Sequence, residues 1–156
     1  MLKPVAAALV LLGSFAAAQA APSCFRQSEI EADQALRFRA DLMVLSDTCR
    51  TDSYRRFMRR NGDLVGAYQQ RMIEHFRRSE GDRAEAAFDR YITTLANEAA
   101  LRHGGELRPS LCAGETDFLG HARRLDPGGF GRYAAERAAE RRRDYRRCAD
   151  EGRSSP

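Results

Sequence analysis

The densest group of side chains that could do chemistry lies near the C-terminal end of the chain. Within residues 141–147, arginines surround one aspartate and one tyrosine. Arginines clustered beside a tyrosine can bind phosphate groups or stack on bases. Nearby acidic residues dilute the positive charge, so a solvated helix face is the alternative interpretation. The anion-binding candidates are Arg141, Arg142, Arg143, Arg146 and Arg147.

The three histidines form no recognisable metal or catalytic motif. None of His75, His103 and His121 lies four residues from another, as paired zinc-binding histidines on one helix do. His103 precedes two glycines, as in esterase oxyanion loops, but the chain has no G-x-S-x-G nucleophile motif. A helix end with a histidine near its negative pole explains the same residues. We therefore name no catalytic residue and expect no metal and no cofactor.

Acidic residues are spread along the chain, often three or four positions from an arginine. Such spacing predicts salt-bridged, exposed helix faces. A pair of carboxylates for glycoside cleavage stays open, because the separation of such a pair depends on the fold. Thr94, Asn97 and Glu98 lie beside an apolar helix face, where they predict an interhelical hydrogen-bond network that fixes helix register.

The first twenty residues have the pattern of a secretory signal peptide. Lys3 supplies the positive start, Val5–Leu12 is an apolar run, and Ala18-Gln19-Ala20 is a cleavage-site pattern. That run is shorter than the ~20 apolar residues of a spanning helix, and the mature chain has no longer one. We expect an exported protein, periplasmic or secreted, with a helical domain over 21–149 and a frayed polar tail over 150–156.

The charge balance is close to neutral. The chain has 156 residues with 26 basic and 22 acidic side chains, and the predicted signal peptide removes only Lys3 from these. So small an excess does not by itself indicate a polyanionic partner. We expect no nucleic-acid partner, because an exported protein rarely meets one.

Four cysteines, Cys24, Cys49, Cys112 and Cys148, lie beyond the predicted signal peptide. An even number in an oxidising compartment predicts two disulfide bonds. No C-x-x-C spacing occurs, so zinc-binding, redox and haem motifs of that type are excluded.

Apolar residues recur at helical intervals, and no strand-like alternation occurs. This predicts an all-α fold, a disulfide-stapled bundle of four to five helices. Gly62 and Gly66 mark either a bend or the close approach of another helix, and Gly104-Gly105 predicts a left-handed helix stop. The predicted helices start at Ser28 (with Glu31 in a capping box), at Asp52 or Ser53, and at Asp82, Cys112 and Pro127. They end near Cys49, Arg78, His103, Leu125 and Cys148.

Four cysteines allow three disulfide pairings. The short connection between the second and third helices predicts an antiparallel hairpin, which would bring Cys49 and Cys112 to one end of the bundle. We therefore predict the pairs Cys49–Cys112 and Cys24–Cys148. A strict up-down bundle would separate Cys24 from Cys148, so the last two helices must depart from that topology.

The middle of the chain resembles a group of uncharacterised exported helical proteins from proteobacteria, over roughly residues 36–120. In that group a cysteine follows the first helix and another follows the third, which implies the Cys49–Cys112 pair. No established activity comes with the resemblance. The residues that carry it are Leu42-Met43-Val44-Leu45 before Cys49, Tyr54, Phe57, Ile92-Thr93-Thr94-Leu95-Ala96-Asn97-Glu98-Ala99 and Leu111-Cys112.

Three functions are consistent with these features. The first is a non-catalytic exported module that binds an unknown protein of the cell envelope. The second is a binder of anionic envelope components, lipid headgroups or polysaccharide, through the arginines of the last helix. The third is a hydrolase with a carboxylate site assembled across helices.

Overall fold

The computed structural model describes residues 24–141 and 143–149, and it confirms the predicted all-α fold. Within these residues the β-type pairing is a single isolated bridge between Phe25 and Arg147. The helices are α1 (Gln27–Thr48), α2 (Ser53–Glu80), a 3₁₀ turn (Gly81–Arg83), α3 (Ala84–His103), α4 (Arg108–Gly114), α5 (Thr116–Ala122) and α6 (Pro127–Ala139).

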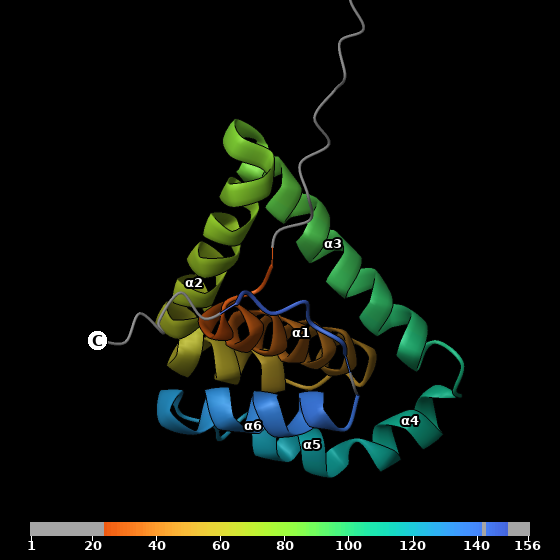
Figure 1. Ribbon diagram of the computed structural model, residues 1–156. Helices are drawn as coiled ribbons and strands as arrows, with labels where there is room; N and C mark the ends of the chain where they lie inside the picture. Colours follow the sequence, from red (N-terminus) through yellow and green to blue (C-terminus); the bar gives the residue numbers. More distant parts are fainter. Residues whose placement is uncertain (1–23, 142, 150–156) are drawn as a thin grey trace, which may run out of the picture.

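Helix α1 is the centre of the fold. Helices α2 and α3 diverge from the turn that joins them, and α1 lies across the opening between them, with α5 and α6 against another of its faces (Figure 1). Gly81 in that turn has a φ of 56°, which glycine adopts without the steric cost of a side chain. Because three sides of α1 are covered, its buried residues are spread around most of its circumference.

The core is built on an aromatic cluster around Phe38 of α1. Its ring centroid lies 5.6 Å from that of Phe57 on α2, 5.5 Å from Phe118 on α5 and 5.6 Å from Phe130 on α6. The pairs with Phe57 and Phe118 are edge-to-face, and packing of this kind adds about 0.5–1.5 kcal/mol per pair to the burial of the rings. The cluster therefore joins α2, α5 and α6 to the central helix.

The two disulfides pair as predicted, Cys49 with Cys112 and Cys24 with Cys148. Cys148 reaches Cys24 because the chain leaves its last helix early. Helix α6 ends at Ala139, so the predicted continuation to Cys148 is wrong. Residues 143–149 have no regular secondary structure, and hydrogen bonds join Phe25 to Arg146 and Cys148 to Phe25.

The distance that the chain must cover explains why the segment after α6 is not helical. Arg141 contacts Asp41, and Arg147 contacts Gln27, so this segment runs back along α1. Fourteen helical residues span about 21 Å at a rise of about 1.5 Å per residue. Six extended residues cover nearly the same distance, whereas six helical residues cover about 9 Å.

Several local predictions are also corrected. The N-terminus of α1 is capped by the Glu29 carboxylate, which accepts a bond from the Arg26 N–H at 2.9 Å, rather than by the pair Ser28 and Glu31. Helix α2 is continuous through Gly62 and Gly66. A Cβ at either position would meet no atom within 4 Å, so no other helix packs closely against these glycines. Gly104 has a φ of −78° and is not left-handed.

The predicted helix from Cys112 to Leu125 is two short helices, α4 and α5. Helix α4 begins earlier because Pro109 suits a first turn, and it ends at Gly114, a residue that favours helix poorly. The start of α6 is as predicted, with Pro127 in the first turn and the Asp126 carboxylate accepting a bond from the Gly129 N–H at 2.7 Å.

No helix within residues 24–141 and 143–149 is long and apolar enough to cross a membrane. The predicted signal peptide, residues 1–20, and the predicted tail, 150–156, lie outside the described residues.

Candidate functional site: an arginine-lined pocket

Charged residues form a row along one side of α1. Glu29, Asp33, Arg37 and Asp41 follow one another at four-residue intervals, which places them on one helix face. The three carboxylates are nearly inaccessible, with exposed fractions of 4%, 1% and 6%. A buried charge is costly unless it is paired and hydrogen-bonded, so each needs partners from the elements packed on α1.

The Asp33 carboxylate accepts hydrogen bonds from its own helix and from two other parts of the chain. Its oxygens accept hydrogen bonds from Arg37 Nε at 2.8 Å, from the Tyr91 hydroxyl of α3 at 2.7 Å and from the Tyr145 hydroxyl at 2.6 Å. Burial and the adjacent Asp33 carboxylate raise the pKa of both tyrosines, so both hydroxyls stay protonated as donors. Asp33 therefore fixes the C-terminal segment and α3 to the same point of the central helix.

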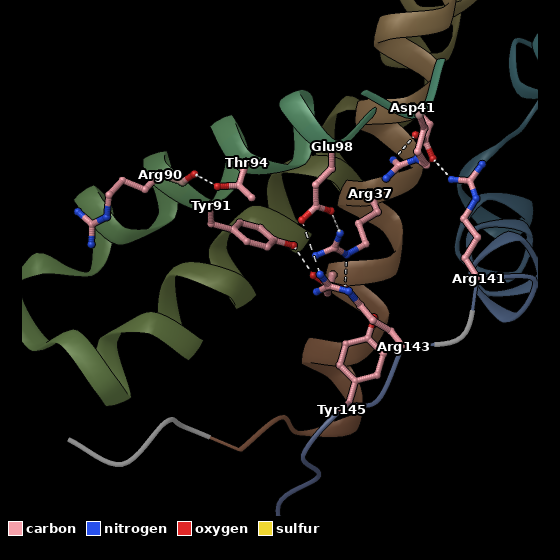
Figure 2. A network of polar contacts seen from close by, with 11 residues as sticks. Arg37, Asp41, Arg90, Tyr91, Thr94, Glu98, Arg141, Arg143 and Tyr145 are labelled. Atoms are coloured by element: carbon pink, nitrogen blue, oxygen red, sulfur yellow. Dashed lines mark hydrogen bonds and ion pairs between the residues drawn. The ribbon is translucent and has the colours of Figure 1, made fainter. Parts of the chain in front are cut away.

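Arg37 and Glu98 form the next connection along the row (Figure 2). Arg37 Nη1 donates to Glu98 Oε2 at 2.6 Å, and Arg143 Nη2 lies 3.7 Å from Glu98 Oε1. The predicted interhelical network is thus present at Glu98. Thr94 instead donates to the backbone oxygen of Arg90 on its own helix, and Asn97 is exposed, so the prediction is wrong for these two residues.

Asp41 closes the row with two arginines. Its Oδ1 accepts a bond from Arg102 of α3, and its Oδ2 accepts one from Arg141 Nη1 at 2.5 Å. One negative charge is thereby shared between two positive ones. This leaves local positive charge where Arg102 of α3 and Arg141, which follows α6, meet one carboxylate; Figure 2 shows Arg141 against Asp41.

These contacts surround a pocket of about 700 Å³ between α1, α3, α6 and the C-terminal segment. Its lining contains three acidic residues, Asp41, Glu98 and Asp144, against twice as many arginines. Two of these arginines, Arg37 and Arg137, also pair with Asp33 and Glu140 outside the lining, which reduces the excess of positive charges from three to one. The arginines of the pocket are Arg37, Arg102, Arg137, Arg141, Arg143 and Arg147.

Only part of the predicted arginine cluster therefore lines the pocket. Arg141, Arg143, Arg146 and Arg147 are all exposed, but only the first two and Arg147 line the pocket, and Arg146 lies outside its lining. Arg142 lies outside the described residues. The backbone oxygen of Arg146 accepts a bond from the Phe25 N–H.

Sequence reasoning missed Arg37, Arg102 and Arg137. A usable signal did exist for Arg37, since a helix with apolar residues around most of its surface also carries charged residues every four positions. Arg102 and Arg137 have no such signal, because they reach the pocket from two helices that are distant in sequence.

A second buried carboxylate centre lies near the start of α1, away from this pocket. Glu29 accepts hydrogen bonds from Arg78 at 2.5 and 2.7 Å, and His75 Nδ1 lies 3.1 Å from it. Burial alone would raise its pKa, but the bonds from Arg78, the Arg26 N–H and His75 outweigh burial and lower the pKa of Glu29 to about 2. A general acid in glycoside cleavage needs the opposite shift, so Glu29 does not support the hydrolase hypothesis.

No family model matches the chain, and searches of curated proteins and of solved structures also give no match. The resemblance of residues 36–120 to exported proteobacterial proteins therefore stays a prediction. Fold and site together define a disulfide-stapled all-α bundle with an arginine-lined pocket.

Proposed function

We propose that this protein is exported and binds a small anionic ligand in the arginine-lined pocket. The observation that carries the proposal is the convergence of six arginines from four parts of the chain on one cavity with three acidic residues. The disulfides support the export step, because such bonds persist in oxidising compartments. The protein-binding role considered from the sequence stays a prediction.

The arginines are held in place before any ligand arrives. Each guanidinium has five N–H donors, and the ion pairs with Asp33, Asp41 and Glu98 use only some of them. Side chains that are already ordered lose less conformational entropy on binding. Arg141 and Arg143, with side chains 41% and 49% exposed, can direct their remaining donors to a ligand.

A pocket also differs from a basic surface patch in how it recognises an anion. Arg102, Arg141 and Arg143 approach from α3 and from the segment after α6, so a bound carboxylate or phosphate could accept bonds from more than one side. Such a site favours a discrete anionic group. The anionic envelope components expected from the sequence are therefore narrowed to molecules that can enter the pocket.

The proposal is tested by titrating the oxidised protein, purified after export from its full-length gene, with phosphate and with citrate, followed by NMR. We expect saturable shifts of the Arg141 and Arg143 side-chain signals. Arg143→Gln combined with Arg141→Gln should weaken binding about tenfold or more, since each variant removes charge-assisted hydrogen bonds.

Arg146→Gln is the matched control, because Arg146 lies in the same segment but outside the pocket lining. It should leave binding close to that of the unaltered protein. Absence of saturable binding, or an equal loss in Arg146→Gln, would refute the proposal.

A further inference from the structure

The pocket is much larger than an anionic group alone requires. Its volume of about 700 Å³ falls in the range of about 300–1,000 Å³ that is typical of sites for drug-sized organic ligands. A bound phosphate or carboxylate would occupy only the part near the arginines. The rest of the cavity must hold either water or the body of a larger molecule.

The chemistry of the walls is divided in a way that favours a larger molecule. One part of the lining is apolar: it consists of Ala134, Ala135 and Ala138 of α6, with Phe38 of α1 and Phe118 of α5, and Ala135 and Ala138 are the more exposed of these. Alanine methyl groups and aromatic carbons offer no hydrogen bond to water. Water there would be poorly held, and an apolar group could displace it favourably.

Most of the charged wall lies on other elements, although Arg37 of α1 and Arg137 of α6 also line the pocket. Arg102 comes from α3. Arg141 and Arg143 come from the segment that follows α6, and Figure 2 shows both side chains. Arg137 lies between the two walls, with its guanidinium 5.2 Å from the ring centroid of Phe118. A ligand that matches both walls needs one anionic end and one apolar end.

From this division we infer that the ligand is a single-chain amphiphilic anion, an alkyl carboxylate of the fatty-acid type. Its carboxylate binds among Arg102, Arg141 and Arg143, and its chain lies along the alanine face of α6. The inference rests on the proposed anion-binding function, and it adds the class of ligand.

Chain length gives the decisive measurement. The test is a series of calorimetric titrations of the oxidised protein, purified after expression from its full-length gene. The ligands are acetate, hexanoate, octanoate and decanoate, each used below the concentration at which it forms micelles. We expect affinity to rise with each added methylene, by up to about fourfold where the methylene is fully buried. Decylammonium, with a similar chain and the opposite charge, should bind far more weakly than decanoate.

Ala138→Leu tests the apolar wall directly, because its larger side chain would fill space where the alkyl chain lies. It should flatten the dependence of affinity on chain length. Ala67→Leu, an equal change on the exposed face of α2, should keep the dependence of the unaltered protein. Circular dichroism melting shows whether either variant is folded, and the chain-length series on the unaltered protein does not depend on any variant.

The outcomes separate the two proposals. If phosphate and citrate bind through Arg141 and Arg143 but decanoate binds no better than acetate, the ligand class is wrong and the anion-binding function stands. If decylammonium binds as well as decanoate, the arginines do not select the amphiphile and the ligand class is wrong, while the anion-binding function is decided by the phosphate and citrate titrations. Affinity that rises with chain length, prefers the carboxylate and loses its slope in Ala138→Leu supports the inference.

Discussion

The Tyr145 hydroxyl donates a hydrogen bond of 2.6 Å to Asp33 Oδ2, across 112 residues of sequence. Tyr145 lies in the segment that returns along α1, and Asp33 is buried in that helix. The same segment carries Arg143 and Arg147, which line the pocket. One buried hydrogen bond thus couples the position of the pocket wall to the centre of the fold.

Tyr145→Phe should therefore lower the free energy of unfolding by about 1–2 kcal/mol, because a hydrogen bond to a buried charged group is lost. Asp33 keeps its bonds from Arg37 and Tyr91, so the protein should still fold. Urea denaturation followed by circular dichroism measures the change. Tyr133→Phe is the control, since its hydroxyl does not belong to the Asp33 network, and it should cost less. Equal losses in both variants would contradict the coupling.

Two glycines in α2 should be replaceable with a gain in stability. Gly62 and Gly66 lie in an uninterrupted helix, and an added Cβ would meet no atom within 4 Å. Alanine at either position should raise the free energy of unfolding by about 0.5–1 kcal/mol, because glycine loses more backbone entropy on folding. Thermal melts compare the two single variants and the double variant.

Gly131→Ala provides the opposite case for the same substitution. Its Cβ would lie 2.8 Å from the Tyr68 hydroxyl oxygen, so the variant should be less stable than the unaltered protein. If Gly62→Ala and Gly131→Ala shifted the melting temperature in the same direction, local space would not decide the outcome.

The helical fold could be predicted from the sequence because it rests on local periodicity and capping, as at Asp126 and Pro127. The disulfide pairing followed from the predicted helix hairpin. The pocket could not be predicted, because it depends on where the chain leaves α6. That point is set by contacts such as Tyr145 with Asp33, which are remote in sequence and leave no periodic signal.

Stability should fall in acid because of Glu29 and His75. The folded pKa of Glu29, about 2, is below its ordinary value of 4.5, so its contribution is complete above pH 4.5 and is lost between pH 4.5 and 2. The shift corresponds to roughly 3 kcal/mol. Burial lowers the pKa of His75, so the folded state resists its protonation and stability also declines as the pH falls below 6.5.

Denaturant unfolding between pH 8 and 2.5 measures this profile. Glu29→Gln should remove most of the decline between pH 4.5 and 2, at the cost of lower stability at pH 7. Glu31→Gln, an exposed carboxyl on the same helix, is the matched control and should keep the steep decline. If the stability of Glu29→Gln declined between pH 4.5 and 2 as steeply as that of the unaltered protein, other groups would control acid unfolding.

The two disulfides should differ in their effect on ligand binding, although both stabilise the fold. The Cys24–Cys148 bond joins residues 124 positions apart and Cys49–Cys112 joins residues 63 apart, so each contributes about 4–5 kcal/mol in the chain-entropy treatment. Only the first fixes the end of the segment that carries Arg143, Tyr145 and Arg147. Replacing Cys24 and Cys148 by serine should therefore weaken citrate binding at least severalfold under conditions where the protein is still folded.

The Cys49→Ser and Cys112→Ser pair should lower stability by a similar amount but leave citrate affinity nearly unchanged, because the pocket lies between α1, α3 and the C-terminal segment. Calorimetry of both double variants at low temperature makes the comparison, and equal affinity losses would show that the segment does not need the Cys24–Cys148 bond to complete the site.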